Sequence, residues 1–139
     1  MPTGDLGKIN HPGRASQQID FRGVRIGQAT PSDIDGIIEI GGELFIFLEY
    51  KHESAPPISY GQRLCLERLV DAITLAGRVS LCVLAQHATP IGFDIDGAGS
   101  RAISVYYKSK WIDTEERCMT VADCVSRACD IAGIQPRHS

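Results

Sequence analysis

The sequence lacks several features that would each point to a class of protein. It has no apolar run long enough to cross a membrane, and its first 13 residues resemble neither a signal peptide nor an anchor. With 43% apolar and 22% charged residues in 139, intrinsic disorder and a fibrous fold are excluded. The five cysteines are odd in number and none has CxxC spacing, which argues against a disulfide framework or a four-ligand zinc site. We therefore expect one soluble, cytoplasmic domain with no membrane partner.

The chain also lacks an excess of basic residues. Lys and Arg number 14 and Asp and Glu number 17, which gives a formal net charge of 14 − 17 = −3. This balance argues against a protein that coats nucleic acid by bulk charge. It leaves open an enzyme that binds a phosphate backbone locally and keeps its carboxylates for a metal ion.

The pattern of apolar residues and breakers predicts one α/β domain. We expect a flexible arm over residues 1–18, the domain over 19–134 and a polar tail over 135–139. The domain should be a mixed β-sheet with a β-meander or hairpin core, flanked by helices. Strands are predicted over residues 21–28, 33–40, 44–51, 79–85 and 103–108. Helices are predicted over residues 60–76, with Ser59 as N-cap, and over 120–132, ended by Gly133.

Acidic residues and a lysine come together in the predicted hairpin. If the turn centres on Gly42, antiparallel pairing places Asp35 opposite Glu49 and Asp33 opposite Lys51. Opposed residues lie roughly 4.5–5.5 Å apart at Cβ, so two carboxylates there can share a divalent cation. A shift of one residue would turn every side chain to the other face, so the register decides between Asp33 and Asp35.

This arrangement suits the hydrolysis of a phosphodiester. Mg²⁺, for which Mn²⁺ can substitute, prefers carboxylate oxygens and makes water a better nucleophile at neutral pH. The ammonium of Lys51 could orient that water or stabilise negative charge in the transition state. The backbone carbonyl of Tyr50 could supply a further ligand. The alternative is a solvated salt bridge at a strand end, but Glu49 follows an apolar strand, where charged residues are rare.

These residues bring a family resemblance. Asp35, followed by Glu49-Tyr50-Lys51 at the end of an apolar strand, resembles the D…(D/E)-x-K signature of the PD-(D/E)xK nuclease superfamily. The stretch SDIDGIIEIGGELFIFLEYKH, followed by GQRLCLERLVDA, is similar to small phage and prophage members. The resemblance covers about residues 20–90.

The resemblance implies a restriction-endonuclease-like fold and a Mg²⁺-dependent endonuclease that processes phage or prophage DNA in the host cytoplasm. It implies that Asp35 and Glu49 bind the metal and that Lys51 is catalytic. It also gives a catalytic place to Gln62, since many members carry a glutamine early in the next helix. Cleavage of both strands or of a junction would require two sites and hence a homodimer.

The sequence departs from the family pattern at two places. The metal position is often preceded by proline, and here Ile34 precedes Asp35. Members usually have an acidic residue on an N-terminal helix, and Asp20 is the only nearby candidate. Gln62 also has a second interpretation, because Ser59-Tyr60-Gly61-Gln62 matches the capping box at a helix start.

Candidate contacts to DNA come from basic and aromatic side chains. We predict His52, Arg63, Tyr107, Lys108 and Lys110 as nucleic-acid-binding residues, since such side chains hold phosphates or stack on bases. The alternatives are an exposed loop histidine, a solvated helix face for Arg63 and a sheet face with extended lysine stems. The alternative function is a non-catalytic nucleic-acid or protein-binding module on the same fold.

Overall fold

The computed structural model describes residues 18–135. The chain divides into two compact units, one up to Pro31 and one from Ser32. In the first unit, every described residue is exposed, and the only pairing there is an isolated bridge between Ile26 and Ala29. The strand predicted over residues 21–28 is therefore wrong, and its alternating apolar side chains, Val24 and Ile26, are exposed. The predicted arm lies outside the described residues except for Gln18, and the predicted tail except for Gln135.

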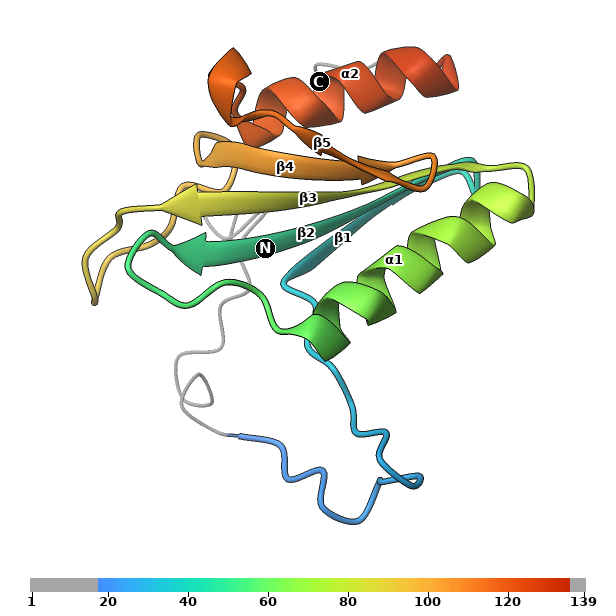
Figure 1. Ribbon diagram of the computed structural model, residues 1–139. Helices are drawn as coiled ribbons and strands as arrows, with labels where there is room; N and C mark the ends of the chain where they lie inside the picture. The colour runs from blue at the N-terminus through green and yellow to red at the C-terminus, as the bar shows by residue number, and fades with distance from the viewer. Residues whose placement is uncertain (1–17, 136–139) are drawn as a thin grey trace, which may run out of the picture. The chain divides into compact units, whose positions relative to one another are not determined.

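The second unit is an α/β domain built on one mixed five-stranded sheet (Figure 1). Its strands are β1 (Gly36–Ile40), β2 (Leu44–His52), β3 (Val79–His87), β4 (Arg101–Tyr107) and β5 (Lys110–Asp113). Neighbouring strands follow the chain order, and only β2 and β3 are parallel. The predicted mixed sheet is confirmed, but β1 begins three residues later than expected, so that Asp33 and Asp35 precede the strand, and β4 begins two residues earlier.

The hairpin between β1 and β2 has the predicted register. Gly36 pairs with Leu48 and Ile40 with Leu44, so the pairing is centred on Gly42. Gly41 and Gly42 both have positive φ, at 58° and 68°, a conformation that glycine adopts without steric cost. The turn chemistry therefore fixes which residues of the two strands oppose each other.

Both predicted helices are present, and Ser59 and Gly133 cap them as the sequence indicated, while the first helix ends at Leu75, one residue before its predicted end. The helix α1 (Tyr60–Leu75) crosses over between the parallel strands, and the Ser59 hydroxyl accepts a hydrogen bond at its start. The helix α2 (Val121–Ala132) begins with a complete capping box at Thr120 and ends at Gly133. Neither helix within residues 18–135 is long and apolar enough to span a bilayer.

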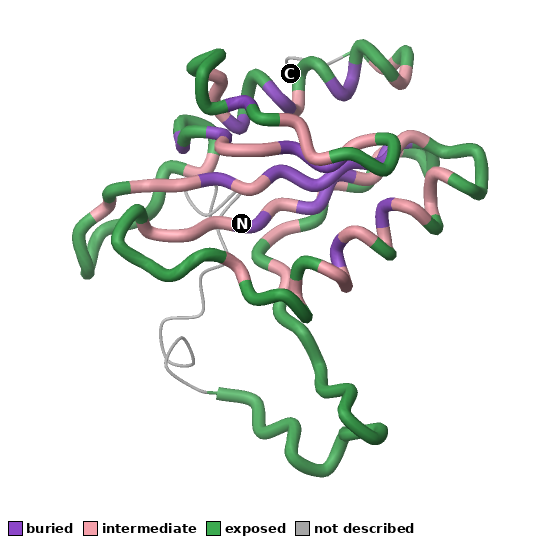
Figure 2. Tube along the Cα trace, viewed as in Figure 1, coloured by how far each residue is buried: buried purple, intermediate pink, exposed green. Residues whose placement is uncertain are grey.

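The helices cover opposite faces of the sheet (Figure 1). Alternation along β2 divides the buried side chains into two cores, and buried positions concentrate on β2, β3 and the inner helix faces (Figure 2). The core beneath α2 includes Leu44, Ile46, Leu81 and Val83. The core beneath α1 includes Phe47, Leu66, Val70, Cys82 and Tyr106.

The last strand was not predicted. β4 and β5 form a hairpin in which Tyr107 pairs with Lys110, so Lys108 and Ser109 form a two-residue turn. Both have positive φ, at 49° and 63°, which is uncommon for residues other than glycine. The usual Asn-Gly signal is missing here, and sequence patterning therefore gave no sign of a turn.

Candidate active site

Glu49 and Lys51 lie near the end of β2 on the face that α1 covers. Glu49 is only 3% exposed, and its side chain emerges beside the core that holds Phe47. The Lys51 side chain is 38% exposed, and its Nζ atom lies 3.9 Å from Oε1 of Glu49. The strand thus ends in a buried carboxylate with an ammonium group toward solvent.

Gln62 fixes the orientation of the Glu49 carboxylate. Its side-chain amide donates to Oε1 of Glu49 at 2.8 Å and to the backbone carbonyl of Asp33 at 3.1 Å. Its backbone N–H donates to the Ser59 hydroxyl at 3.2 Å, so one half of the capping box is present. The side chain completes no capping box, because it reaches the strand instead of the N-cap amide. The first turn of α1 is therefore joined directly to β2.

The two aspartates of the predicted pair have different positions. Asp35 immediately precedes β1, and its Oδ2 accepts a hydrogen bond from the Tyr50 backbone N–H at 2.7 Å. Asp33 is exposed and is held through its carbonyl. In a strand, the N–H and C=O of one residue point to the same side. The Tyr50 carbonyl therefore lies on the same side of β2 as Asp35.

One oxygen of Glu49 has no partner. Its Oε2 atom is buried and makes no hydrogen bond in the described part of the chain. Burial first, and then the negative charge of Asp35, raise the pKa of Glu49. The hydrogen bond from Gln62, then the backbone N–H of Asp35 and the charge of Lys51, lower the pKa of Glu49 and oppose this effect. An unpaired buried carboxylate oxygen is costly, and a bound cation would remove that cost.

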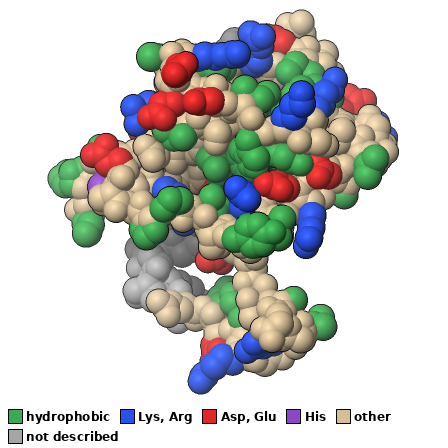
Figure 3. Space-filling model, in the orientation of Figure 1, with side chains coloured by type: hydrophobic (Ala, Val, Ile, Leu, Met, Phe, Trp, Pro, Cys, Tyr) green, Lys and Arg blue, Asp and Glu red, His purple; other side chains and the backbone are tan. Residues whose placement is uncertain are grey.

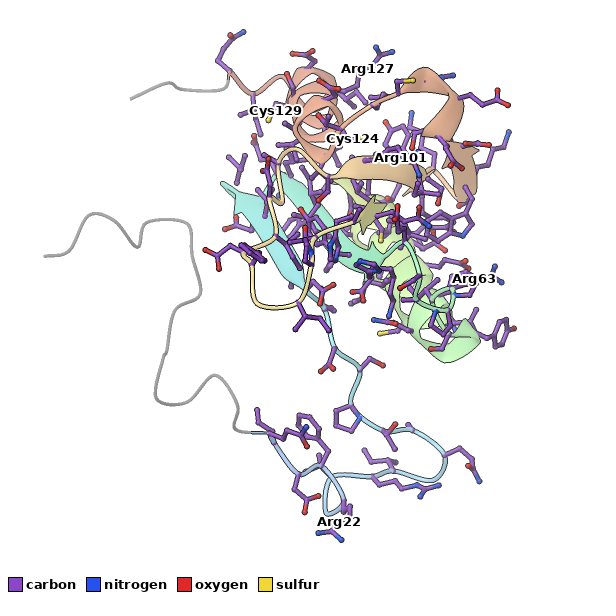
Figure 4. The ribbon with its side chains drawn as sticks, turned by 90° about the vertical axis from the view of Figure 1, so that its left-hand side faces the viewer. Arg22, Arg63, Arg101, Cys124, Arg127 and Cys129 are labelled. Carbon is purple, nitrogen blue, oxygen red and sulfur yellow. The ribbon has the colours of Figure 1, made fainter. Side chains whose placement is uncertain are left out.

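A cavity opens beside these side chains. It is lined by Glu49 and Lys51, by the loop from Ala55 to Ile58, and by Leu84, Ala85, Gln86 and Ile103. Gln86 pairs with Lys51 across the parallel strands and accepts a hydrogen bond from Arg101 at 3.2 Å. Arg101 begins β4, and Arg63 extends from α1 (Figure 4). Sequence reasoning missed Gln86, since only the strand order places it next to Lys51.

The predicted DNA contacts are not gathered at one place. Arg63 lies exposed on α1, on the same face of the sheet as Glu49. His52 follows the alternation of β2 to the opposite face, where its ring packs edge-on against His87 at 5.3 Å. Tyr107 packs against the core beneath α2, with the Nζ atom of Lys108 5.4 Å from its ring centre.

Lys110 begins β5 and is exposed. The two-residue turn at Lys108 comes just before it in the chain. This turn follows Tyr106, which pairs with Cys82 in the first half of β3. Glu49 instead pairs with Leu84, further toward the carboxyl end of β3. The turn with its lysines therefore extends from the other end of the sheet.

Comparison with known proteins indicates no function for the chain, so the functional assignment rests on the geometry of the site alone. No protein-family model, no curated protein and no solved structure matches the chain. Among residues 18–135, no group of three or more His, Cys, Asp or Glu side chains is arranged to hold a metal ion. The candidate site offers two carboxylates, Asp35 and Glu49, so backbone carbonyl and water oxygens would have to complete a coordination shell.

Proposed function

We propose that the chain is a Mg²⁺-dependent DNA endonuclease with a restriction-endonuclease-like fold, of the kind that processes phage or prophage DNA. The observation that carries this proposal is the Glu49 carboxylate, 3% exposed, with its Oε2 unpartnered and Lys51 beside it. A buried charge with an open coordination position is uncommon unless a ligand completes it. After the β1–β2 hairpin, α1 and β3 follow in the order helix, then strand that the resemblance implies, although two strands and not a three-stranded meander precede the helix.

The donor set fits a hard divalent cation. Asp35, Glu49 and the Tyr50 carbonyl would hold the ion with oxygen atoms, whereas Asp33 is exposed and contacts the site through its backbone carbonyl. When bound, Mg²⁺ would activate water and neutralise charge on the scissile phosphate. The same ion would remove the repulsion between Asp35 and Glu49 that raises the pKa of Glu49.

The side chains around the cation have separate tasks. Lys51, half-exposed at the site, would place its ammonium group against the phosphate, where negative charge increases in the transition state. Gln62 acts through Glu49, since its amide holds Oε1, while the buried Oε2 has no hydrogen-bond partner among the described residues. Gln62 is therefore a positioning residue.

Cleavage of plasmid and branched DNA in Mg²⁺ tests the proposal. Lys51→Ala should abolish cleavage, and the circular dichroism spectrum and unfolding midpoint should stay close to those of wild type, because among the described residues the half-exposed Lys51 makes only one long ion pair. Arg68→Ala is the matched control, since Arg68 is exposed on α1 and lines no part of the site. Undiminished cleavage by Lys51→Ala would exclude the proposed role.

Calorimetry with Mn²⁺ separates the enzyme from a non-catalytic module. We expect wild-type protein to bind the ion and Glu49→Gln to lose that binding, since the neutral amide offers a weaker ligand. No binding by wild type, together with retained DNA affinity, would favour the module.

A further inference from the structure

A groove on the α1 face of the sheet continues from the candidate active site. A second cavity adjoins the one at Glu49, and the two share Pro57, Ile58 and Leu84. Its volume is about 360 Å³, within the range of roughly 300–1,000 Å³ typical of small-ligand sites. The far part of this groove is lined by Tyr60, Arg63, Ser104 and Trp111.

Two aromatic rings line the groove in different ways. Trp111 is held in place, since its Nε1–H donates to Oε2 of Glu67 at 2.7 Å and its ring packs on Tyr106 at 5.1 Å. Tyr60 is 68% exposed at the start of α1. A fixed ring and an exposed ring on one apolar groove are suited to stacking a flat ligand.

A positively charged side chain lies at each end of the groove, where it would attract an anionic group on that side of the ligand. Arg63 lies with its guanidinium 5.7 Å from the centre of the Tyr60 ring, and Lys51 stands at the other end. The ion pair of Arg63 with Glu67, at 3.4 Å, is made through Nε, and a guanidinium carries several further N–H donors. Figure 3 shows hydrophobic side chains next to both basic and acidic side chains over the region where α1 lies.

We propose that this groove holds one unpaired nucleobase of DNA, next to the phosphate that is cleaved. Pro57, Ile58 and Trp111 give the groove an apolar lining, which suits the face of a base better than a phosphate. A base within intact duplex DNA is stacked and cannot enter a side groove, whereas an unpaired base can. This inference rests on the proposed nuclease function and specifies its substrate as DNA with an unpaired nucleotide beside the scissile bond.

Fluorescence provides a direct test, because Trp111 is the single tryptophan of the chain. The full-length protein is titrated in Ca²⁺ with a labelled duplex and with the same duplex carrying one unpaired nucleotide. We expect about tenfold tighter binding of the second DNA, a difference of about 1.4 kcal/mol. Only that DNA should quench the Trp111 emission, since quenching requires a base against the ring.

Variants of Tyr60 test whether the preference for the unpaired nucleotide arises in this groove. Tyr60→Ala should remove most of the preference for the unpaired nucleotide, and Tyr60→Phe should keep it, because stacking needs the ring and not the hydroxyl. Phe93→Ala is the matched control, since Phe93 is 72% exposed and does not line the groove. Circular dichroism should show all three variants folded.

The outcomes separate this inference from the proposed function. Cleavage in Mg²⁺ with equal affinity for both DNAs and no quenching overturns the groove assignment and leaves the nuclease standing. Preference with quenching but no cleavage supports the groove and contradicts the nuclease. A preference that Tyr60→Ala retains in full, with Trp111 emission unchanged, overturns the inference.

Discussion

The side-chain amide of Gln62 lies 2.8 Å from Oε1 of Glu49 and joins the first turn of α1 to the end of β2. The same amide nitrogen reaches the carbonyl of Asp33, just ahead of β1. Three segments that are separate in sequence thus meet at one polar group beside an almost fully buried carboxylate. This contact determines which oxygen of Glu49 accepts a hydrogen bond and which stays buried without a partner among the described residues.

Replacement of Gln62 by alanine should weaken Mn²⁺ binding and cleavage more than it weakens the fold. The backbone N–H of residue 62 still caps α1 through Ser59, so the loss of stability comes from the buried Glu49 oxygen left without a donor and should be about 1–3 kcal/mol. The hydrogen bond from Gln62 lowers the pKa of Glu49. Its removal should therefore move the pH dependence of Mn²⁺ binding, measured by calorimetry, to higher pH.

Ser59→Ala is the matched control for Gln62→Ala. It removes the cap of α1 and should lower the free energy of unfolding by about 1 kcal/mol. The Mn²⁺ affinity and its pH dependence should stay those of wild type, since the Gln62 side chain keeps its contacts. A Gln62→Ala protein with unchanged Mn²⁺ affinity would contradict the positioning role.

Glu49 should make the metal-free protein less stable as the pH rises. Its pKa in the folded state is raised from the usual 4.5, so the folded protein holds the proton more tightly than the unfolded chain does. Its contribution to stability is therefore greatest below pH 4.5 and is lost as the pH rises through the folded pKa. Urea unfolding in EDTA, compared between wild type and Glu49→Gln, measures this trend.

The difference in free energy of unfolding between wild type and Glu49→Gln should grow above pH 4.5, with Glu49→Gln the more stable protein. Mn²⁺ should reverse it at neutral pH, because the ion stabilises only the protein that binds it. A difference that is independent of pH would show that Glu49 does not titrate as its burial and its proximity to Asp35 require.

The cysteines should differ sharply in reactivity. Cys82 is fully buried, and burial, with a smaller effect of the Glu49 charge, raises the pKa of its thiol to about 12. Cys118 is exposed beyond the short 3₁₀ helix at Glu115–Arg117. A short pulse of iodoacetamide at pH 8 should label Cys118 first and leave Cys82 unlabelled, as peptide mass spectrometry would show.

Labelling of Cys82 at the rate of Cys118 in folded protein would contradict its burial. In urea both thiols should react alike, since the pKa of Cys82 returns to its ordinary value when the chain unfolds. That measurement serves as the internal control.

The turn between β4 and β5 offers a stabilising substitution. Replacement of Lys108-Ser109 by Asn-Gly should raise the free energy of unfolding by roughly 1 kcal/mol, because both positions have positive φ. Urea unfolding measures the gain. Gly77→Ala is the opposite control, since Gly77 has a φ of 86° and alanine is strained there.

The same double variant tests the predicted DNA contact of Lys108. The turn lies away from Glu49, so we expect cleavage to be unchanged. A marked loss of DNA affinity would show that DNA reaches across β4 to this turn.

Local chemistry accounts for the parts of the fold that could be predicted from the sequence. The two glycines at the turn and the apolar alternation around them define the β1–β2 register, and hence that Asp35 lies next to the Glu49 strand. Ser59, Thr120 and Gly133 mark helix ends through contacts within a few residues. The strand predicted over residues 21–28 was wrong because alternation alone supplies no partner.

What the sequence determined by itself is the hairpin with its register and the two helices, since these depend on turn residues, caps and side-chain period. Only the tertiary structure decided that Gln62 contacts Glu49 instead of its own helix start, and that His52 faces away. It also placed Gln86 beside Lys51, and Trp111 on the groove next to the site. These are contacts between elements distant in the chain, and they depend on strand order and helix packing, which no local pattern encodes.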